Sequence, residues 1–225
     1  MSSYLFRYGF LPGRQMRYVI SIKGGVDIEM PMGNIKNPIS MEMRISQKIA
    51  SCDAEQAMIR VIIDHVSADK SVPAESLPKT GVESTMQMDS LGTVRWVGGN
   101  AAWQGAEHSM MRFPEQALQV GDSWVQRVED ASGSATAFHT RYCFVGCDED
   151  NEKLMIFSTE LFSGHPDDPA SGLIGKGIFS YDDEEKWIHG CSNHIEYRYR
   201  MAMPDNSGEF FTTSTILQIE MERLS

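Results

Sequence analysis

The chain has 225 residues, of which 41% are hydrophobic and 23% are charged, and its formal net charge is −11. This composition predicts a globular protein with its own core, and it excludes collagen, coiled coil and intrinsic disorder as descriptions of the whole chain. No run approaches the ~18 apolar residues of a membrane-spanning helix, so we expect no transmembrane segment. The acidic charge repels phosphate backbones, so we do not expect nucleic acid as a partner.

The charge is divided unevenly along the chain. Residues 1–112 carry 12 basic and 11 acidic side chains, whereas residues 113–225 carry 8 and 20. This asymmetry favours head-to-tail association, so a homo-oligomer is one possible assembly. The alternative is that acidic turns, which solvate hairpin tips and block edge pairing, simply fall in the second part.

The sequence leaves the compartment unknown. The first residues, Met1-Ser-Ser-Tyr-Leu-Phe-Arg, lack the basic stretch, apolar core and cleavage site of a signal peptide. We therefore expect a cytoplasmic protein unless a leader has been removed. Four cysteines in 225 residues are too few for a disulfide-based scaffold.

The dominant sequence pattern has a period of two. From Met41 to Ile49 the odd positions are mainly apolar and the even ones polar, and residues 194–203 repeat the alternation. Such alternation, with turn signals between segments, predicts antiparallel strands that have one solvated face. In chain order we predict strands at 4–10, 16–22, 41–49, 57–66, 85–88, 93–97, 124–128, 136–145, 154–162, 177–181, 186–189, 194–203 and 212–221. One short helix is expected near 101–112, before Pro114.

A faint repeat divides the chain into a first β half, 1–112, and a second, 113–225. Cys52-Asp53 corresponds to Cys147-Asp148, and the hairpin that contains Trp96 corresponds to the one that contains Trp187. The predicted fold class is all-β, with two related antiparallel halves in one continuous fold. The halves would form a curved sheet, a clasp or an open barrel.

The sequence contains no recognisable catalytic or metal-binding motif. There is no G-x-S-x-G, Walker A, H-E-x-x-H or paired C-x-x-C. His189 and Cys191 are two residues apart and could chelate a metal only with further ligands from neighbouring strands. We therefore predict a protein that is not an enzyme and has no metal or cofactor.

Methionine is unusually frequent, with 15 residues. Eight of them form four Met-x-Met pairs, which places both thioethers of a pair on one face of a strand. Three uses fit this pattern: Cu(I) binding, an adaptable apolar surface for a ligand or partner, or filling of an irregular core. The pairs are Met30/Met32, Met41/Met43, Met86/Met88 and Met201/Met203.

Three segments carry a resemblance to known proteins: Tyr4-Leu-Phe-Arg-Tyr8 with Pro12-Gly13, the Met-x-Met strands, and Phe113-Pro-Glu followed by Val120-Gly-Asp-Ser-Trp124. Together they resemble an uncharacterised family of duplicated β-rich bacterial proteins, often exported or lipid-anchored. That architecture is similar to the half-barrel lipoprotein carriers, which hold acyl chains against a curved sheet. The resemblance implies a binding role and supplies no catalytic residues.

We therefore predict a non-enzymatic binding protein that holds an apolar small molecule, or a segment of a protein partner, on a curved sheet. The alternative is a structural or assembly component that acts through protein–protein contacts. The predicted ligand-binding side chains are methionines and tyrosines on the inner face of the strands: Met43, Met88, Tyr197, Tyr199 and Met201.

Overall fold

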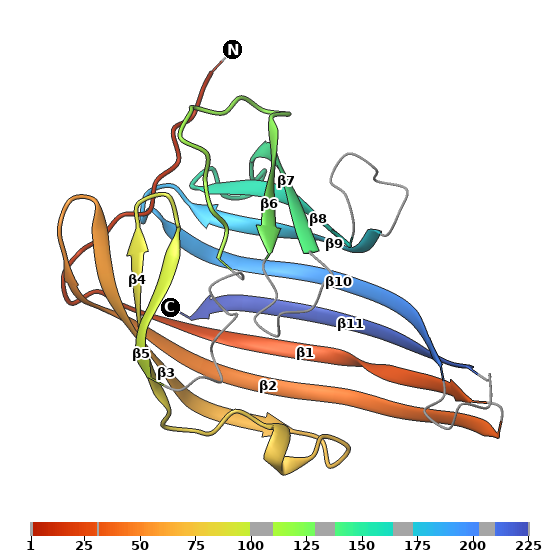
Figure 1. The fold of residues 1–225 in the computed structure, drawn as a ribbon. Helices are drawn as coiled ribbons and strands as arrows, with labels where there is room; N and C mark the ends of the chain where they lie inside the picture. The colour runs from red at the N-terminus through yellow and green to blue at the C-terminus, as the bar shows by residue number, and fades with distance from the viewer. Residues whose placement is uncertain are drawn as a thin grey trace.

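The computed structural model describes residues 2–30, 32–99, 110–128, 138–163, 173–202 and 210–224. Eleven strands form one antiparallel sheet in the order β5-β4-β3-β2-β1-β11-β10-β9-β8-β7-β6 (Figure 1). A single 3-10 turn, Ala74–Ser76, is the only helical element in this part of the chain. The strands are β1 Gln15–Met30, β2 Gly33–Cys52, β3 Gln56–Ala68, β4 Glu83–Asp89, β5 Val94–Gly99, β6 Ser123–Val128, β7 Phe138–Cys147, β8 Leu154–Ser163, β9 Leu173–Asp182, β10 Trp187–Ala202 and β11 Phe210–Leu224.

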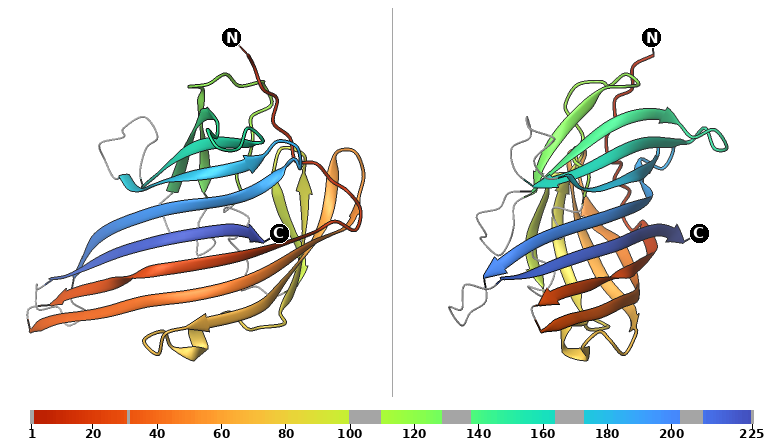
Figure 2. Two further views of the ribbon diagram at one scale, coloured as in Figure 1. Left: turned by 180° about the vertical axis from the view of Figure 1, so that it is seen from behind. Right: turned by 90° about the vertical axis from the view of Figure 1, so that its right-hand side faces the viewer.

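The sheet is curved and is not closed into a barrel. The first and last strands of the sheet order, β5 and β6, are edges that no described strand joins to one another. Two further views show the curl, with β1, β2, β10 and β11 forming a long central blade (Figure 2). The predicted all-β antiparallel class is confirmed, as one curved sheet.

The predicted helix near 101–112 falls mostly outside the described residues. Its last three residues, 110–112, are described and are not helical. Met110 and Met111 are buried there as part of an irregular segment that runs toward Leu118. Among the described residues, no helix is long and apolar enough to cross a membrane.

The β1–β2 hairpin is longer than the alternation predicts. The predicted strands stop at residue 22 and resume at 41, whereas the ladder continues to Met30 opposite Gly33. Gly24, Gly25 and Pro38 weaken the local strand signal. At Gly24 an added Cβ would lie 1.9 Å from the Ile216 carbonyl oxygen, so close pairing with β11 requires glycine.

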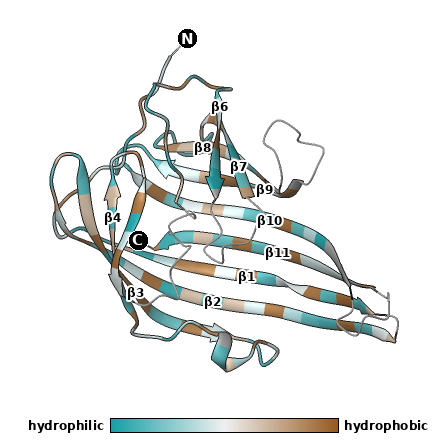
Figure 3. Ribbon diagram, in the orientation of Figure 1, coloured by the Kyte–Doolittle hydropathy of each residue, from teal (hydrophilic) through white to brown (hydrophobic). Residues whose placement is uncertain are grey.

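The buried side chains lie on the inner face of the curved sheet. Alternating hydrophilic and hydrophobic residues follow the long strands in Figure 3. On β3, Ala57, Ile59, Val61 and Ile63 are buried, and the residues between them are more exposed. One solvated and one buried face is the arrangement that period-two alternation predicts.

The N-terminal segment differs from its prediction as a strand at 4–10. Only Tyr4 forms a β-bridge, with Leu118. The Tyr8 amide donates to the Ser90 carbonyl over 2.8 Å, and the Gly9 amide donates to the Lys186 carbonyl over 2.9 Å. The segment thus ties together two hairpin turns, and tertiary contacts replace the ladder that its alternation favoured.

The two sides of the sheet have matching details. Strands β5 to β1 and strands β10 to β6 stand in the same spatial order, and β11 lies between the two groups. The β2–β3 ladder has a register shift after Ile49 and the β7–β8 ladder has one after Phe144. The Gly13 amide donates to the Ile49 carbonyl, and the Gly121 amide donates to the Phe144 carbonyl. These matches support the duplication as a proposal.

The two tryptophans of the suggested repeat do not correspond. Trp187 is the first residue of β10, opposite Asp182, whereas Trp96 is the third residue of β5, opposite Met86. The prediction that they hold equivalent hairpin positions is therefore wrong. The turn between Asp182 and Trp187 is one residue longer than the turn between Asp89 and Thr93, so matching the tryptophans by sequence misaligned the hairpins.

Candidate binding cavity

One end of the inner face is solid. Phe6 of the N-terminal segment contacts the rings of Tyr4, Phe113, Phe144, Phe157 and Tyr181, with centroids 5.0–6.1 Å apart. Below it lies a layer of fully buried strand residues, which we call the packed layer. Its members have no exposed surface: Ile49, Ile59, Met88, Phe144, Phe157, Tyr181 and Trp187.

Two residues farther along these strands, the interior is hollow. A cavity of about 480 Å³ lies over the inner face. Six of its lining residues stand two positions from a member of the packed layer, and we call them the cavity layer: Gln47, Val61, Met86, Tyr142, Thr159 and Phe179. The remaining lining residues are Tyr18, Ile20, Ile45, Trp96, Met110, Thr140, Leu161, Gly175, Lys176, Ile188, Cys191, Asn193, His194, Ile195, Ile219 and Met221.

The change from solid to hollow follows side-chain size. Along β8, Phe157 is followed at the next inner position by Thr159, and along β3, Ile59 is followed by Val61. The N-terminal segment, which supplies Phe6 to the packed layer, supplies no residue to the cavity lining. A curved sheet lined by smaller side chains leaves a volume typical of small-molecule pockets.

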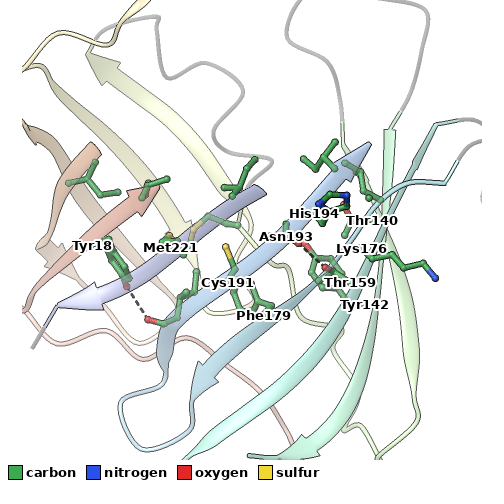
Figure 4. Close-up of a pocket in the computed structure, with 18 of the residues that line it drawn as sticks. Tyr18, Thr140, Tyr142, Thr159, Lys176, Phe179, Cys191, Asn193, His194 and Met221 are labelled. Carbon is green, nitrogen blue, oxygen red and sulfur yellow. Dashed lines mark hydrogen bonds between the residues drawn. The ribbon is translucent and has the colours of Figure 1, made fainter. Parts of the chain in front are cut away.

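Polar side chains on the β7–β10 side of the cavity have partners. The Thr159 hydroxyl donates to Asn193 Oδ1 over 2.9 Å, across Gly177 of the intervening strand β9 (Figure 4). An added Cβ at Gly177 would lie 2.2 Å from that oxygen, so glycine permits the contact. At the other end of the cavity, the Tyr18 hydroxyl donates to the Ile188 carbonyl over 3.1 Å.

The β2–β5 side differs, because two polar atoms there are buried without partners. Gln47 Oε1 and Trp96 Nε1 are inaccessible to solvent and have no hydrogen-bond partner. Both side chains line the cavity. A buried polar group without a partner carries a desolvation cost, so these atoms are ready to bond a group placed in the cavity.

The cavity lining is electrically neutral. Lys176 is the only Lys, Arg, Asp or Glu among its described lining residues, and Figure 4 shows its chain pointing away from the other labelled side chains. Its ammonium pairs with Glu160 over 3.6 Å. Burial raises the pKa of Tyr18, Tyr142 and Cys191, so the two phenols and the thiol stay uncharged at neutral pH.

The predicted site residues do not gather at this cavity. Met43 and Met88 are buried in the hydrophobic core, and neither lines the cavity. Tyr197 lies partly buried on β10, on the same face as Ile195, and is also outside the lining. Tyr199 and Met201 pair with Thr213 and Phe211 in the β10–β11 ladder, and their side chains lie outside the described part.

Sequence reasoning missed the polar lining residues, although one signal was present. Gln47 interrupts the apolar positions of 41–49, and a polar side chain at an inward position marks either a paired group or a binding group. Among the described residues, no three His, Cys, Asp or Glu side chains are grouped so that they could hold a metal ion.

No protein-family model matches the sequence, and no curated protein shows significant similarity to it. The fold and cavity described above therefore carry the functional argument alone.

Proposed function

We propose that this protein is a non-enzymatic binding protein that holds an apolar small molecule in the cavity within its curved sheet. The observation that carries the proposal is a 480 Å³ space, lined mainly by aliphatic, aromatic and thioether side chains, directly beside a fully packed layer. Ligand pockets are typically apolar, largely preformed and 300–1,000 Å³ in volume.

The cavity volume limits the ligand. At about 30 Å³ for each atom the size of a water molecule, 480 Å³ holds about 16 non-hydrogen atoms. A single medium-length hydrocarbon chain or a compact ring system has this size. Met86, Met110 and Met221 line the cavity with flexible, polarizable side chains that adapt to ligand shape.

A binding role fits the chemistry of the lining better than catalysis does. The Cys191 thiol has its pKa raised by burial, which disfavours the nucleophilic thiolate. Thr159 donates to an amide oxygen and not to a general base. The proposal therefore assigns these groups to shape and orientation.

The proposal is tested by filling the cavity. Naphthalene is the probe, and protein is titrated into it in a calorimeter. Ile219 lines the cavity on β11, whereas Ile216 of the same strand is 47% exposed. We expect Ile219→Phe to weaken naphthalene binding at least about tenfold, and Ile216→Phe to leave it unchanged.

The variants must first show wild-type circular dichroism and cooperative unfolding. Equal naphthalene affinity in wild type and in both folded variants, or no binding by any of them, would overturn the proposed function.

An assembly role is the second candidate, and the open sheet edges favour it. Val97 on β5 and Val125 on β6 are 56% and 41% exposed on strands whose outer edges no described strand covers. Unprotected apolar edges invite pairing with another chain. Sedimentation across a concentration series tests this candidate: association that Val97→Lys abolishes would support it, and a monomer throughout would remove it.

A further inference from the structure

The two sides of the cavity make different demands on a ligand, which narrows the proposed function further. On the β7–β10 side, Thr159 and Asn193 satisfy each other. On the β2–β5 side, Gln47 and Trp96 present an acceptor and a donor that nothing in the protein engages. The inference below rests on the proposed function.

The sheet register places these two groups on one wall. Gln47 pairs with Val61, which pairs with Ser84, while Trp96 pairs with Met86, two residues from Ser84 on the same strand. Met86 and Val61 also line the cavity. Gln47 and Trp96 therefore face the ligand space from neighbouring rows of the β2–β5 wall, with apolar side chains between them.

The unmatched atoms specify what would satisfy them. The Gln47 amide oxygen accepts a hydrogen bond, and the Trp96 indole N–H donates one. A hydroxyl or a primary amide can donate to the first and accept from the second. A carboxylate can only accept, and its charge would be desolvated in a lining whose one lysine points outward to Glu160.

We infer that the ligand is a neutral amphiphile: an apolar body of cavity size that carries a hydroxyl or amide group directed at the β2–β5 wall. Its polar group donates to Gln47 Oε1 and accepts from Trp96 Nε1. Its hydrocarbon part lies toward Ile219 and Met221 of β11 and Leu161 of β8.

Three probes of one shape test this inference: naphthalene, 2-naphthol and 2-naphthoate, each measured by calorimetry at pH 7. One net hydrogen bond corresponds to an affinity gain of about fivefold to tenfold. We therefore expect 2-naphthol to bind about five to ten times more tightly than naphthalene. We expect 2-naphthoate to bind more weakly than either of them.

Two variants assign the preference to its groups. Gln47→Met keeps the length of the side chain and removes the acceptor, and Trp96→Phe keeps an aromatic ring and removes the N–H. Each should lower 2-naphthol affinity toward that of naphthalene while naphthalene affinity changes less than twofold. Met86→Leu, in the same wall, is the control and should keep the preference for 2-naphthol.

A second readout needs no ligand. Because each variant removes a buried polar atom that lacks a partner, the ligand-free Gln47→Met protein should melt about 2–4 °C above wild type. A lower melting temperature would mean that Gln47 is satisfied in the free protein, and it would contradict the inference.

The outcomes separate this inference from the function beneath it. If neither naphthalene nor 2-naphthol binds, the proposed function fails. If both bind equally and the two variants change nothing, the binding function stands and the neutral-amphiphile inference is overturned. Tightest binding of 2-naphthoate would overturn the neutrality of the ligand alone.

Discussion

The packed layer and the cavity layer are neighbours on one face of one sheet, yet one is solid and the other hollow. In the packed layer, large side chains from the strands meet Phe6 and Phe113 from outside the sheet. Two residues along, the strands offer Gln47, Val61 and Thr159, and the N-terminal segment supplies nothing to the lining. The comparison teaches that the packed end holds the sheet curved, so that the adjoining layer can stay open.

The largest expected effect lies in the packed layer. Phe6 is only 2% exposed and contacts five aromatic rings, although it belongs to no strand. We expect Phe6→Ala to lower the free energy of unfolding by about 4–5 kcal/mol, because truncation leaves a rigid void. Leu5, its 56% exposed neighbour, is the control: Leu5→Ala should change stability by less than about 0.5 kcal/mol in urea titrations.

The same substitution in both layers compares them directly. Ile59 has no exposed surface, whereas Ile219 faces the cavity and is partly exposed. Ile59→Ala should cost about 3–4 kcal/mol, from lost transfer energy and a new void. Ile219→Ala should cost only about 1–2 kcal/mol, because space already lies on one side of it. Equal losses in urea unfolding would mean that the cavity is filled in solution.

Gly177 tests how tightly the β7–β10 wall is built. An added Cβ would lie 2.3 Å from the Ser192 carbonyl oxygen and would also press on Asn193. Gly177→Ala should therefore cost about 2 kcal/mol, within the usual range for overpacking. At Gly98 of β5 no atom lies within 4 Å of an added Cβ, so Gly98→Ala should leave thermal stability unchanged or slightly raised.

The smallest expected effect concerns a turn at the packed end. The Asp53 carboxylate accepts hydrogen bonds from the Glu55 and Gln56 amides, which lowers its pKa below the ordinary value. A lowered folded-state pKa contributes stability above the unfolded-state pKa, and this stability is lost as pH falls through the folded-state value. Between about pH 5 and about pH 2, wild type should therefore lose slightly more stability than Asp53→Asn. Parallel acid-unfolding curves would contradict this.

The sequence predicted the strands because period-two alternation reports directly which face is buried. It predicted 41–49 and 57–66 within the observed β2 and β3. It failed at residues 4–10, where alternation looks the same whether the backbone pairs with a strand or crosses hairpin turns. It also failed at 23–40, where pairing with β11 and β2 overrides the poor strand propensity of Gly24, Gly25 and Pro38.

The cavity was harder to predict than the sheet. Alternation shows which side chains point inward, but it does not show where facing side chains fail to meet. Met86 and Met88 share a face, yet Met86 lines the cavity and Met88 belongs to the packed layer. That distinction depends on Phe6, which is 80 residues or more from both in the chain and adjacent to the packed layer only in the fold.

Methionine methyl groups provide the most direct test of the central claim, that the cavity layer takes up an apolar molecule and the packed layer does not. With ¹³C-labelled methionine methyls, naphthalene should shift the NMR signals of Met86 and Met221, which line the cavity. The signals of Met88 and Met111, which have no exposed surface and lie outside the lining, should stay in place. Shifts spread equally over all four, or confined to Met88 and Met111, would contradict the account.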